Sequence, residues 1–261
     1  MNFDLSQVPT RTAKPRKHGL TMVMDKGLSL REAEDILSVS AGNIDLLKLG
    51  FGTAYVTPNL DKKIALYKSA GVNVYFGGTL LEAFLIRGQL DDYIKLIEKY
   101  KLEHVELSDG SITIPHDEKC ALIRRLSKLA TVITEVGSKE EGIIIHPAKW
   151  IEMMNTEIEA GAWKVIAEAR ESGTVGIFRP SGKAHVVLIN KIISKVPQEK
   201  IIWETPVKSQ QTYFIKLLGA NVNLGNIAPH DVLPLETLRL GLRSDTFFSF
   251  LNGKTSQLMR G

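Results

Sequence analysis

Residues 20–37 read LTMVMDKGLSLREAEDIL, and this stretch joins two different hydrophobic patterns. Its first part, Leu20–Met24, is a short apolar run of the kind that forms a strand buried on both faces. Ser29 then stands three residues before Glu32, and a serine followed at that spacing by an acidic residue is typical of a helix N-terminus. The stretch therefore predicts a strand followed at once by an amphipathic helix.

The same pair of patterns recurs along the chain. Seven further apolar runs, rich in Val, Ile and aromatic residues, are predicted as strands: Ile44–Leu49, Val72–Phe76, His104–Leu107, Thr131–Val136, Trp163–Ala167, Ile201–Trp203 and Ala220–Leu224. A helical period follows each of them, over Leu60–Ser69, Leu90–Lys99, Asp117–Leu129, Ala148–Glu159, Ala184–Lys195, Ser209–Leu218 and Pro234–Leu242. Together with the first unit, these segments make eight strand–helix pairs.

The pairs repeat about every 28 residues, a length that suits one strand–helix unit of a closed barrel of eight parallel strands. An open, doubly wound parallel sheet is the competing architecture. It favours a glycine-rich phosphate-binding turn after the first strand, and Met24-Asp-Lys-Gly is not such a turn. We therefore predict an α/β fold with a single domain, a (β/α)8 TIM barrel at residues 18–250, flanked by an N-terminal arm (1–17) and a C-terminal tail (251–261).

The composition is that of an ordinary globular protein. The 261 residues include 33 Lys and Arg against 29 Asp and Glu, a formal net charge of +4, and 44% of them are hydrophobic. No apolar run approaches the roughly 18 residues of a membrane span, and the N-terminal residues lack the apolar core of a secretory signal. A single cysteine, Cys120, excludes an internal disulfide and fits a reducing compartment. We expect a soluble cytoplasmic protein with no membrane association.

Basic residues cluster weakly near the N-terminus. Lys14, Arg16 and Lys17 lie in a short segment with no aromatic residues between them. Surfaces that bind nucleic acid carry a stronger positive charge, so we predict a solvated arm and no nucleic-acid partner. Small anionic substrates would explain the mild positive charge equally well.

Polar residues gather where the predicted strands end, which is where barrels of this type carry their chemistry. Four successive strands each carry a glutamate between apolar neighbours: Glu106, Glu135, Glu168 and Glu204. A buried glutamate is costly unless it is paired, hydrogen-bonded or bound to a metal. Four of them on adjacent strands would repel one another without cations.

Two arrangements would stabilise these carboxylates. The first is a divalent ion, and oxygen ligands with no cysteine and few histidines suit Mg²⁺ better than zinc. The second is a lattice of salt bridges with the nearby cations Lys26, Lys48, Lys139 and Arg170. The metal site is the preferred interpretation, and the lattice stays open as the alternative.

Residues suited to binding an anion stand near the same strand ends. Arg170 shares a strand face with Glu168, and its guanidinium matches carboxylate or phosphate oxygens with two parallel hydrogen bonds. Ser108 shares a face with Glu106 in the same way. The other candidates are two glycines that let backbone amides approach an anion and two residues in the last loops, where barrels often hold phosphate: Gly50, Gly78, Lys208 and Asn226.

Eight segments spread over residues 18–247 form a specific set, although no single one would suffice. They are LTMVMDKG at 20–27, LKLGFGT at 47–53, FGGTLLE at 76–82, VELSDGS at 105–111, ITEVG at 133–137, EARESG at 168–173, KSQQ at 208–211 and LETLRLGLRSDT at 235–246. In this order they resemble motifs of the phosphosulfolactate synthase family. The resemblance implies a (β/α)8 barrel that adds sulfite to phosphoenolpyruvate with Mg²⁺, giving (2R)-phospho-3-sulfolactate, the reaction that opens coenzyme M synthesis in methanogens.

The resemblance also implies roles for individual residues. Lys139, which follows the Thr-Glu-Val-Gly motif, is the candidate proton donor, and Glu106 and Arg170 are the other catalytic candidates. The candidate metal ligands are Glu135, Glu168 and Glu204. The candidate substrate-binding residues are Lys26, Lys48, Gly50, Gly78, Ser108, Arg170, Lys208 and Asn226. The sequence departs from the family at Ser138, where a further basic residue could stand in other members.

The partners implied are the small anions phosphoenolpyruvate and sulfite, and a homo-oligomer formed through the outer helices. Two other functions compete with the lyase. Plant relatives of the family include a heat-stress-associated protein, and a non-catalytic homologue could act through protein interaction. An aldolase would need a Schiff-base lysine inside a late strand, where this chain carries Glu168 and Glu204 instead. The charged strand ends favour the lyase over both.

Overall fold

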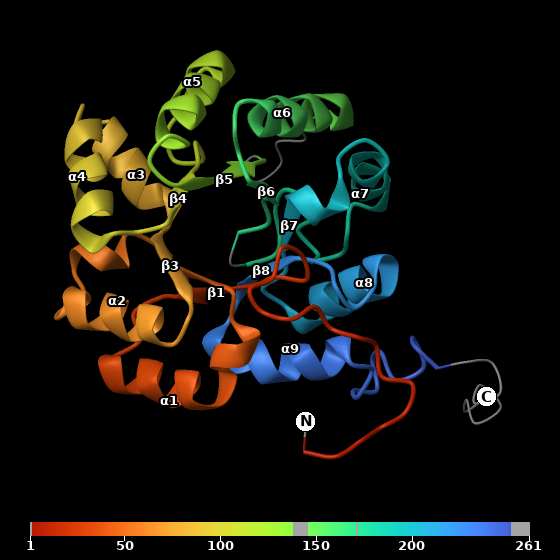
Figure 1. Ribbon diagram of the computed structural model, residues 1–261. Coiled ribbons are helices and arrows are strands. Elements are labelled where there is room, and N and C mark those ends of the chain that lie inside the picture. The colour runs from red at the N-terminus through yellow and green to blue at the C-terminus, as the bar shows by residue number, and fades with distance from the viewer. Residues whose placement is uncertain (1, 138–145, 171, 252–261) are drawn as a thin grey trace.

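The computed structural model describes residues 2–137, 146–170 and 172–251. Among them, eight parallel strands form one sheet in the order β3-β2-β1-β8-β7-β6-β5-β4, and the two end strands β3 and β4 contact each other, so the sheet closes almost completely into a barrel (Figure 1). The strands are β1 (Thr21–Asp25), β2 (Leu46–Leu49), β3 (Asn73–Phe76), β4 (His104–Leu107), β5 (Thr131–Val136), β6 (Lys164–Ala167), β7 (Ile201–Glu204) and β8 (Leu224–Ile227).

Helices surround the barrel on the outside (Figure 1). They are α1 (Leu30–Ser40), α2 (Leu60–Ser69), α3 (Gly78–Leu85), α4 (Leu90–Tyr100), α5 (His116–Leu126), α6 (Pro147–Glu159), α7 (Val186–Ile193), α8 (Lys208–Leu218) and α9 (Val232–Arg239). The sequence signal at the first helix is confirmed, because Ser29 and Glu32 form a reciprocal capping box there. The prediction of a single-domain (β/α)8 barrel is likewise confirmed.

The apolar core has two parts. The larger part lies between the strands and the helices, and the smaller fills the barrel interior with side chains such as Met22, Ile133, Ile166 and Ile202. Strand β8 passes close to this inner cluster, since a Cβ at Gly225 would lie 2.5 Å from Cε of Met22. The inner cluster closes the barrel, so any ligand site must lie at one of its ends.

Two predicted elements need correction. The last strand is not Ala220–Leu224 but begins at Leu224, because its inward positions carry small or polar residues that a search for apolar runs misses. The structure also adds a helix, α3, directly after β3, where the sequence pattern predicts no helix before Leu90. Gly77 is extended and acts as the N-cap, and the apolar residues that follow bury one face of the helix.

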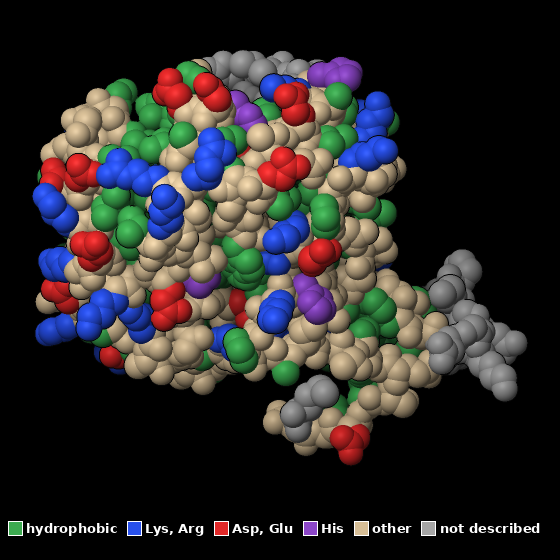
Figure 2. All heavy atoms as spheres, turned by 45° about the horizontal axis from the view of Figure 1, so that its top comes forward, with side chains coloured by type: hydrophobic (Ala, Val, Ile, Leu, Met, Phe, Trp, Pro, Cys, Tyr) green, Lys and Arg blue, Asp and Glu red, His purple; other side chains and the backbone are tan. Residues whose placement is uncertain are grey.

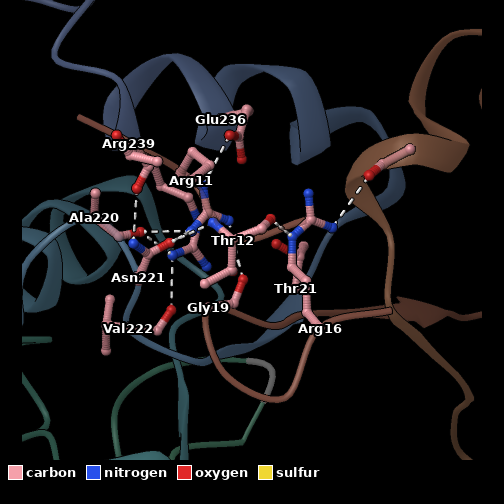
Figure 3. A network of polar contacts seen from close by, with 12 residues as sticks. Arg11, Thr12, Arg16, Gly19, Thr21, Ala220, Asn221, Val222, Glu236 and Arg239 are labelled. Atoms are coloured by element: carbon pink, nitrogen blue, oxygen red, sulfur yellow. Dashed lines mark hydrogen bonds and ion pairs between the residues drawn. The ribbon is translucent and has the colours of Figure 1, made fainter. Parts of the chain in front are cut away.

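The prediction of a solvated arm is wrong for Arg11 and Arg16 (Figure 3), while Lys17 is exposed. Arg11 pairs with Glu236 at 2.9 Å and donates to the carbonyl oxygens of Gly19 and Ala220, just before β1 and β8. Arg16 pairs with Asp45 at 3.1 Å. These guanidiniums close the amino-terminal end of the barrel, so their charge serves the fold rather than a solvated surface.

The surface charge elsewhere is mixed. Figure 2 shows basic and acidic side chains interspersed over the face that it presents, the pattern of an ordinary solvated surface. Within the described part of the chain, no helix combines the length and the apolar character that crossing a bilayer requires.

Replacing Arg239 by methionine is expected to lower the free energy of unfolding by about 3 kcal/mol. This fully buried guanidinium donates to the carbonyl oxygens of Ala220 and Val222 (Figure 3) and to that of Leu20, and the substitution leaves all three without that donor. Urea unfolding followed by circular dichroism measures the change. Lys216→Met, at an exposed position of α8, is the matched control and should stay within about 0.5 kcal/mol. A loss below about 1 kcal/mol in Arg239→Met would contradict this role.

Candidate active site

A cavity of about 260 Å³ opens at the carboxyl ends of the strands. Most of the candidate residues from the sequence line it: Lys48, Gly50, Glu106, Glu135, Glu168, Arg170, Glu204 and Asn226. They come from six different strands or from the residues directly after them. The fold thus brings together side chains that lie far apart in the sequence.

Three of the glutamates form a compact group on neighbouring strands. Glu135 lies in β5, Glu168 directly follows β6, and Glu204 ends β7. All three are buried, and each offers a carboxylate oxygen within 4.8 Å of the others. Backbone amides help to hold two of them: the amide of Ala169 donates to Glu204 at 2.9 Å, and that of Arg170 donates to Glu168 at 2.7 Å. The three residues could hold a metal ion.

Lys48 connects this group to the fourth glutamate. Its buried ammonium lies 3.2 Å from Oε2 of Glu106 and 3.5 Å from Oε1 of Glu204. The amide of Gly78 donates to Oε1 of Glu106 at 2.8 Å. Both interpretations of the glutamates therefore contribute: Lys48 pairs with Glu106 and Glu204, and Glu204 is also one of the three carboxylates close enough to share an ion.

The electrostatics of the site favour a further cation. Burial raises the pKa of Glu204 to about 7, with Glu135 and Glu106 acting in the same direction and Lys48 opposing them. Burial alone would lower the pKa of Lys48, but the surrounding carboxylates outweigh it and raise that pKa above its ordinary value. The ionisable residues described in the lining are four carboxylates, one ammonium and one guanidinium, a formal charge of −2 that a divalent ion would neutralise.

Two other lining residues have left-handed backbone conformations. Arg170 has a φ of 56° and an exposed side chain at the rim of the cavity. Asn226 has a φ of 55° and is buried, and its Oδ1 has no hydrogen-bond partner among the described residues. Left-handed non-glycine residues are strained, and such strain is often found at ligand sites.

Four candidates lie outside the lining. The ammonium of Lys26 lies over the ring of Phe51 at 5.8 Å, and that of Lys208 pairs with Asp245 at 3.1 Å. Gly78 contacts the site only through its amide, and the hydroxyl of buried Ser108 donates to Glu82. The remaining candidate, Lys139, and the neighbouring Ser138 fall outside the described residues.

Sequence reasoning missed several residues that support the site from behind. Lys119 of α5 is fully buried and donates to the carbonyl oxygen of Glu135 at 2.7 Å, while it pairs with Glu157 at 2.9 Å. Asp25, at the end of β1, pairs with Lys63 at 2.6 Å and accepts from the hydroxyl of Tyr67. The helical pattern in the sequence shows only that these lysines lie on helices. It does not show which residues of other elements they contact.

The structure also shows a lysine in a late strand, Lys164 of β6, which the sequence interpretation passed over. Burial lowers its pKa to about 8. Its ammonium donates to the carbonyl oxygens of Lys17 and Glu199, at the amino-terminal end of the barrel and on the far side of the inner apolar cluster. Its position therefore gives no support to a Schiff-base aldolase at the cavity.

Comparison with known proteins finds relatives that match almost the whole chain. The family model of (2R)-phospho-3-sulfolactate synthase (ComA) matches residues 9–245. The chain is 39% identical over 251 residues to the phosphosulfolactate synthase of Bacillus subtilis, covering 95% of this chain and 100% of that protein. It is 41% identical over 239 residues to the phosphosulfolactate synthase of Methanocaldococcus jannaschii, covering 88% and 94%.

Among solved structures, 3-hexulose-6-phosphate synthase from Salmonella typhimurium superimposes with a TM-score of 0.57 over 86% of this chain and 100% of that one. At 12% identity this likeness shows the barrel fold alone. The sequence relatives go further, because they match the chain over almost its whole length. The chain belongs to the (2R)-phospho-3-sulfolactate synthase family.

Proposed function

We propose that this protein is a carbon–sulfur lyase that adds sulfite to phosphoenolpyruvate and forms (2R)-phospho-3-sulfolactate. The observation that carries the proposal is the cavity in which three mutually close, buried carboxylates stand beside Lys48 and Arg170. The names of the relatives from Bacillus subtilis and Methanocaldococcus jannaschii support the same reaction.

The donor set fits Mg²⁺. Glu135, Glu168 and Glu204 supply hard carboxylate oxygens, and burial, aided by Glu135 and Glu106, raises the pKa of Glu204, as expected of a carboxylate that lacks a sufficient positive counter-charge. These three residues would hold the ion. Bound there, Mg²⁺ would supply Lewis-acid stabilisation of the negative charge that develops on the substrate.

The reaction forms one bond between the sulfur of sulfite and the CH₂ carbon of phosphoenolpyruvate. The electrons of the double bond move to the carbon that bears the carboxylate, and a proton adds there. Lys48 stays protonated, since its pKa is raised, and so places a fixed positive charge beside the developing negative one. Arg170, exposed at the rim, is suited to binding phosphate or sulfite oxygens with two parallel hydrogen bonds. We assign the proton to Nζ of Lys139.

An anaerobic assay tests the proposal directly. The protein is incubated with phosphoenolpyruvate, sulfite and Mg²⁺, and phosphorus NMR follows the conversion of the substrate resonance into that of the product. Matched reactions leave out sulfite or replace Mg²⁺ with a chelator, and both should be inactive. Absence of turnover in the complete mixture would overturn the proposed reaction and favour a non-catalytic homologue.

Mg²⁺ is expected to raise Tm more at about pH 8 than at about pH 5.5. The folded pKa of Glu204, about 7, exceeds its ordinary value of 4.5, so the folded protein holds this proton more tightly than the unfolded one. Without metal, this group therefore makes the free energy of unfolding fall as pH rises between those two values. Mg²⁺ binds the ionised carboxylate and offsets the loss of stability that ionisation causes. The rise in Tm on adding Mg²⁺ is therefore largest above the folded pKa.

Differential scanning fluorimetry with and without Mg²⁺ at the two pH values measures this effect. Glu204→Gln has no carboxyl group to titrate at this position, so its Mg²⁺-dependent shift should be small at both. Equal shifts in the wild-type protein at the two pH values would show that Glu204 does not govern metal binding.

A further inference from the structure

The barrel has a seam beside the candidate active site. Strands β3 and β4 are the two ends of the sheet, and the described residues form no backbone ladder between them. At the carboxyl end of this seam, hydrogen bonds between amides, a hydroxyl and carboxylates take the place of a ladder. One of them is the bond from the amide of Gly78 to Glu106, and the others converge on Glu82 of helix α3.

Glu82 is buried, and its carboxylate accepts hydrogen bonds from the loop after β4. Oε1 accepts from the hydroxyl of Ser108 and from the amide of Gly110 at 3.3 Å. Oε2 accepts from the amide of Ser111 at 2.5 Å and from that of Ile112 at 3.0 Å. A carboxylate offers about four acceptor positions, and four donors from residues 108–112 bond to the two oxygens of Glu82. Bonds from amides to a charged acceptor are stronger than neutral ones, and they hold the loop in one position.

This loop reaches the cavity while Glu82 does not. Ser111 is part of the lining, whereas Glu82 lies behind it on α3. The segments 76–82 and 105–111 were both singled out by the sequence motifs, yet the proposed reaction has so far used neither Glu82 nor Ser111. The hydrogen bond between them links the two segments, because Glu82 of the first holds Ser111 of the second.

We propose that Glu82 is a positioning residue that fixes the loop after β4, so that the hydroxyl of Ser111 binds the anionic substrate. This inference rests on the proposed function. A hydroxyl can donate to a phosphate or sulfite oxygen, and its contribution depends on being held in place before the substrate arrives. The amides of Gly110, Ser111 and Ile112 cannot serve as that donor, because they already donate to Glu82.

The first test is Glu82→Gln, which keeps the size of the side chain. In glutamine an NH₂ group replaces one of the two carboxylate oxygens. This group is a donor, so the loop donors that bond to that oxygen in the wild type lose their acceptor. We expect kcat/KM to fall by about 10²-fold, the scale of a small misplacement of a binding group. Amide hydrogen exchange across residues 108–112 should become faster than in the wild type. Glu82→Asp keeps the charge but shortens the side chain, so its kcat/KM and its exchange rates should lie between those of the wild type and Glu82→Gln. This variant replaces Glu82→Gln in the test if Glu82→Gln does not fold.

A double-mutant cycle distinguishes positioning from simple stabilisation. If Glu82 acts through Ser111, adding Ser111→Ala to Glu82→Gln should reduce kcat/KM little further. Asp45→Asn is the control, because Asp45 is a buried carboxylate that accepts from Arg16 and from the amide of Thr21 at the opposite end of the barrel. It should lower Tm and leave kcat/KM unchanged.

The inference is overturned if Glu82→Gln keeps the wild-type kcat/KM. It is also overturned if the fold-losses in kcat/KM of Glu82→Gln and Ser111→Ala multiply in the double variant, or if Asp45→Asn loses as much activity as Glu82→Gln. Those outcomes all require an active wild-type enzyme and leave the proposed function in place. An inactive wild-type protein would overturn the proposed function, and this inference with it.

Discussion

Glu168→Gln should lower kcat/KM for the addition of sulfite to phosphoenolpyruvate by about 10²–10³-fold. The substitution removes one negative charge from the three carboxylates that lie within 4.8 Å of one another. It leaves an oxygen that can still accept from the amide of Arg170, so the local backbone should keep its conformation. Steady-state kinetics over a Mg²⁺ titration should show that the variant needs a much higher metal concentration.

The rise in Tm that Mg²⁺ causes in the wild type should also shrink in Glu168→Gln, which gives a readout independent of turnover. Glu236→Gln is the matched control, because Glu236 pairs with Arg11 at the far end of the barrel. It should keep the wild-type Mg²⁺ dependence. Full activity of Glu168→Gln at the wild-type metal concentration would remove Glu168 from the metal site.

The fold was predictable because the apolar runs of this chain are short, regularly spaced and separated by helical periods. The fourth and fifth strands begin and end where the sequence placed them. The last strand escaped because packing against Met22 restricts Gly225 to a residue without a side chain, which erases the apolar pattern there. Periodicity measures burial along one element, so it fails where a neighbouring element dictates a small residue.

The glutamates of the site were predictable for a related reason. A charged residue inside a strand buried on both faces conflicts with its surroundings, and that conflict is visible in the sequence alone. Glu82 and Lys119 lie on helices, where a charged residue raises no conflict. Each finds its partners on other elements, so only the tertiary structure shows that they are buried. The structural role of Arg11 was hidden in the same way, because its partners Glu236 and Ala220 lie more than 200 residues away in the sequence.

Lys48→Met is expected to lower the free energy of unfolding by about 3–5 kcal/mol and to abolish measurable turnover. The ammonium of Lys48 lies between Glu106 and Glu204, and all three residues are buried. Methionine has nearly the same length but no charge, so the two carboxylates are left buried without their cation. Urea unfolding in the presence of a chelator measures the loss without any contribution from bound metal.

The double variant Lys48→Met/Glu106→Gln separates this electrostatic cost from packing. Removing one partner of a buried pair leaves a charge uncompensated, whereas removing both is often close to neutral. The double variant should therefore regain a large part of the lost stability while it stays inactive. No recovery would mean that the ammonium stabilises the barrel through its packing rather than through its charge.

The pH dependence of Lys48→Met gives the sharpest form of this argument. Without the ammonium, which opposes the rise in the wild type, the pKa of Glu204 should move further above that of the unfolded chain, so the folded variant binds this proton more tightly than the unfolded one. Its free energy of unfolding should then fall as pH increases, and the deficit relative to wild type should be larger at about pH 8 than at about pH 5.5. The raised pKa of Lys48 keeps the wild-type lysine charged across this range, so it contributes no such slope itself. A deficit that is constant with pH would contradict the charge pairing, because lost packing does not titrate.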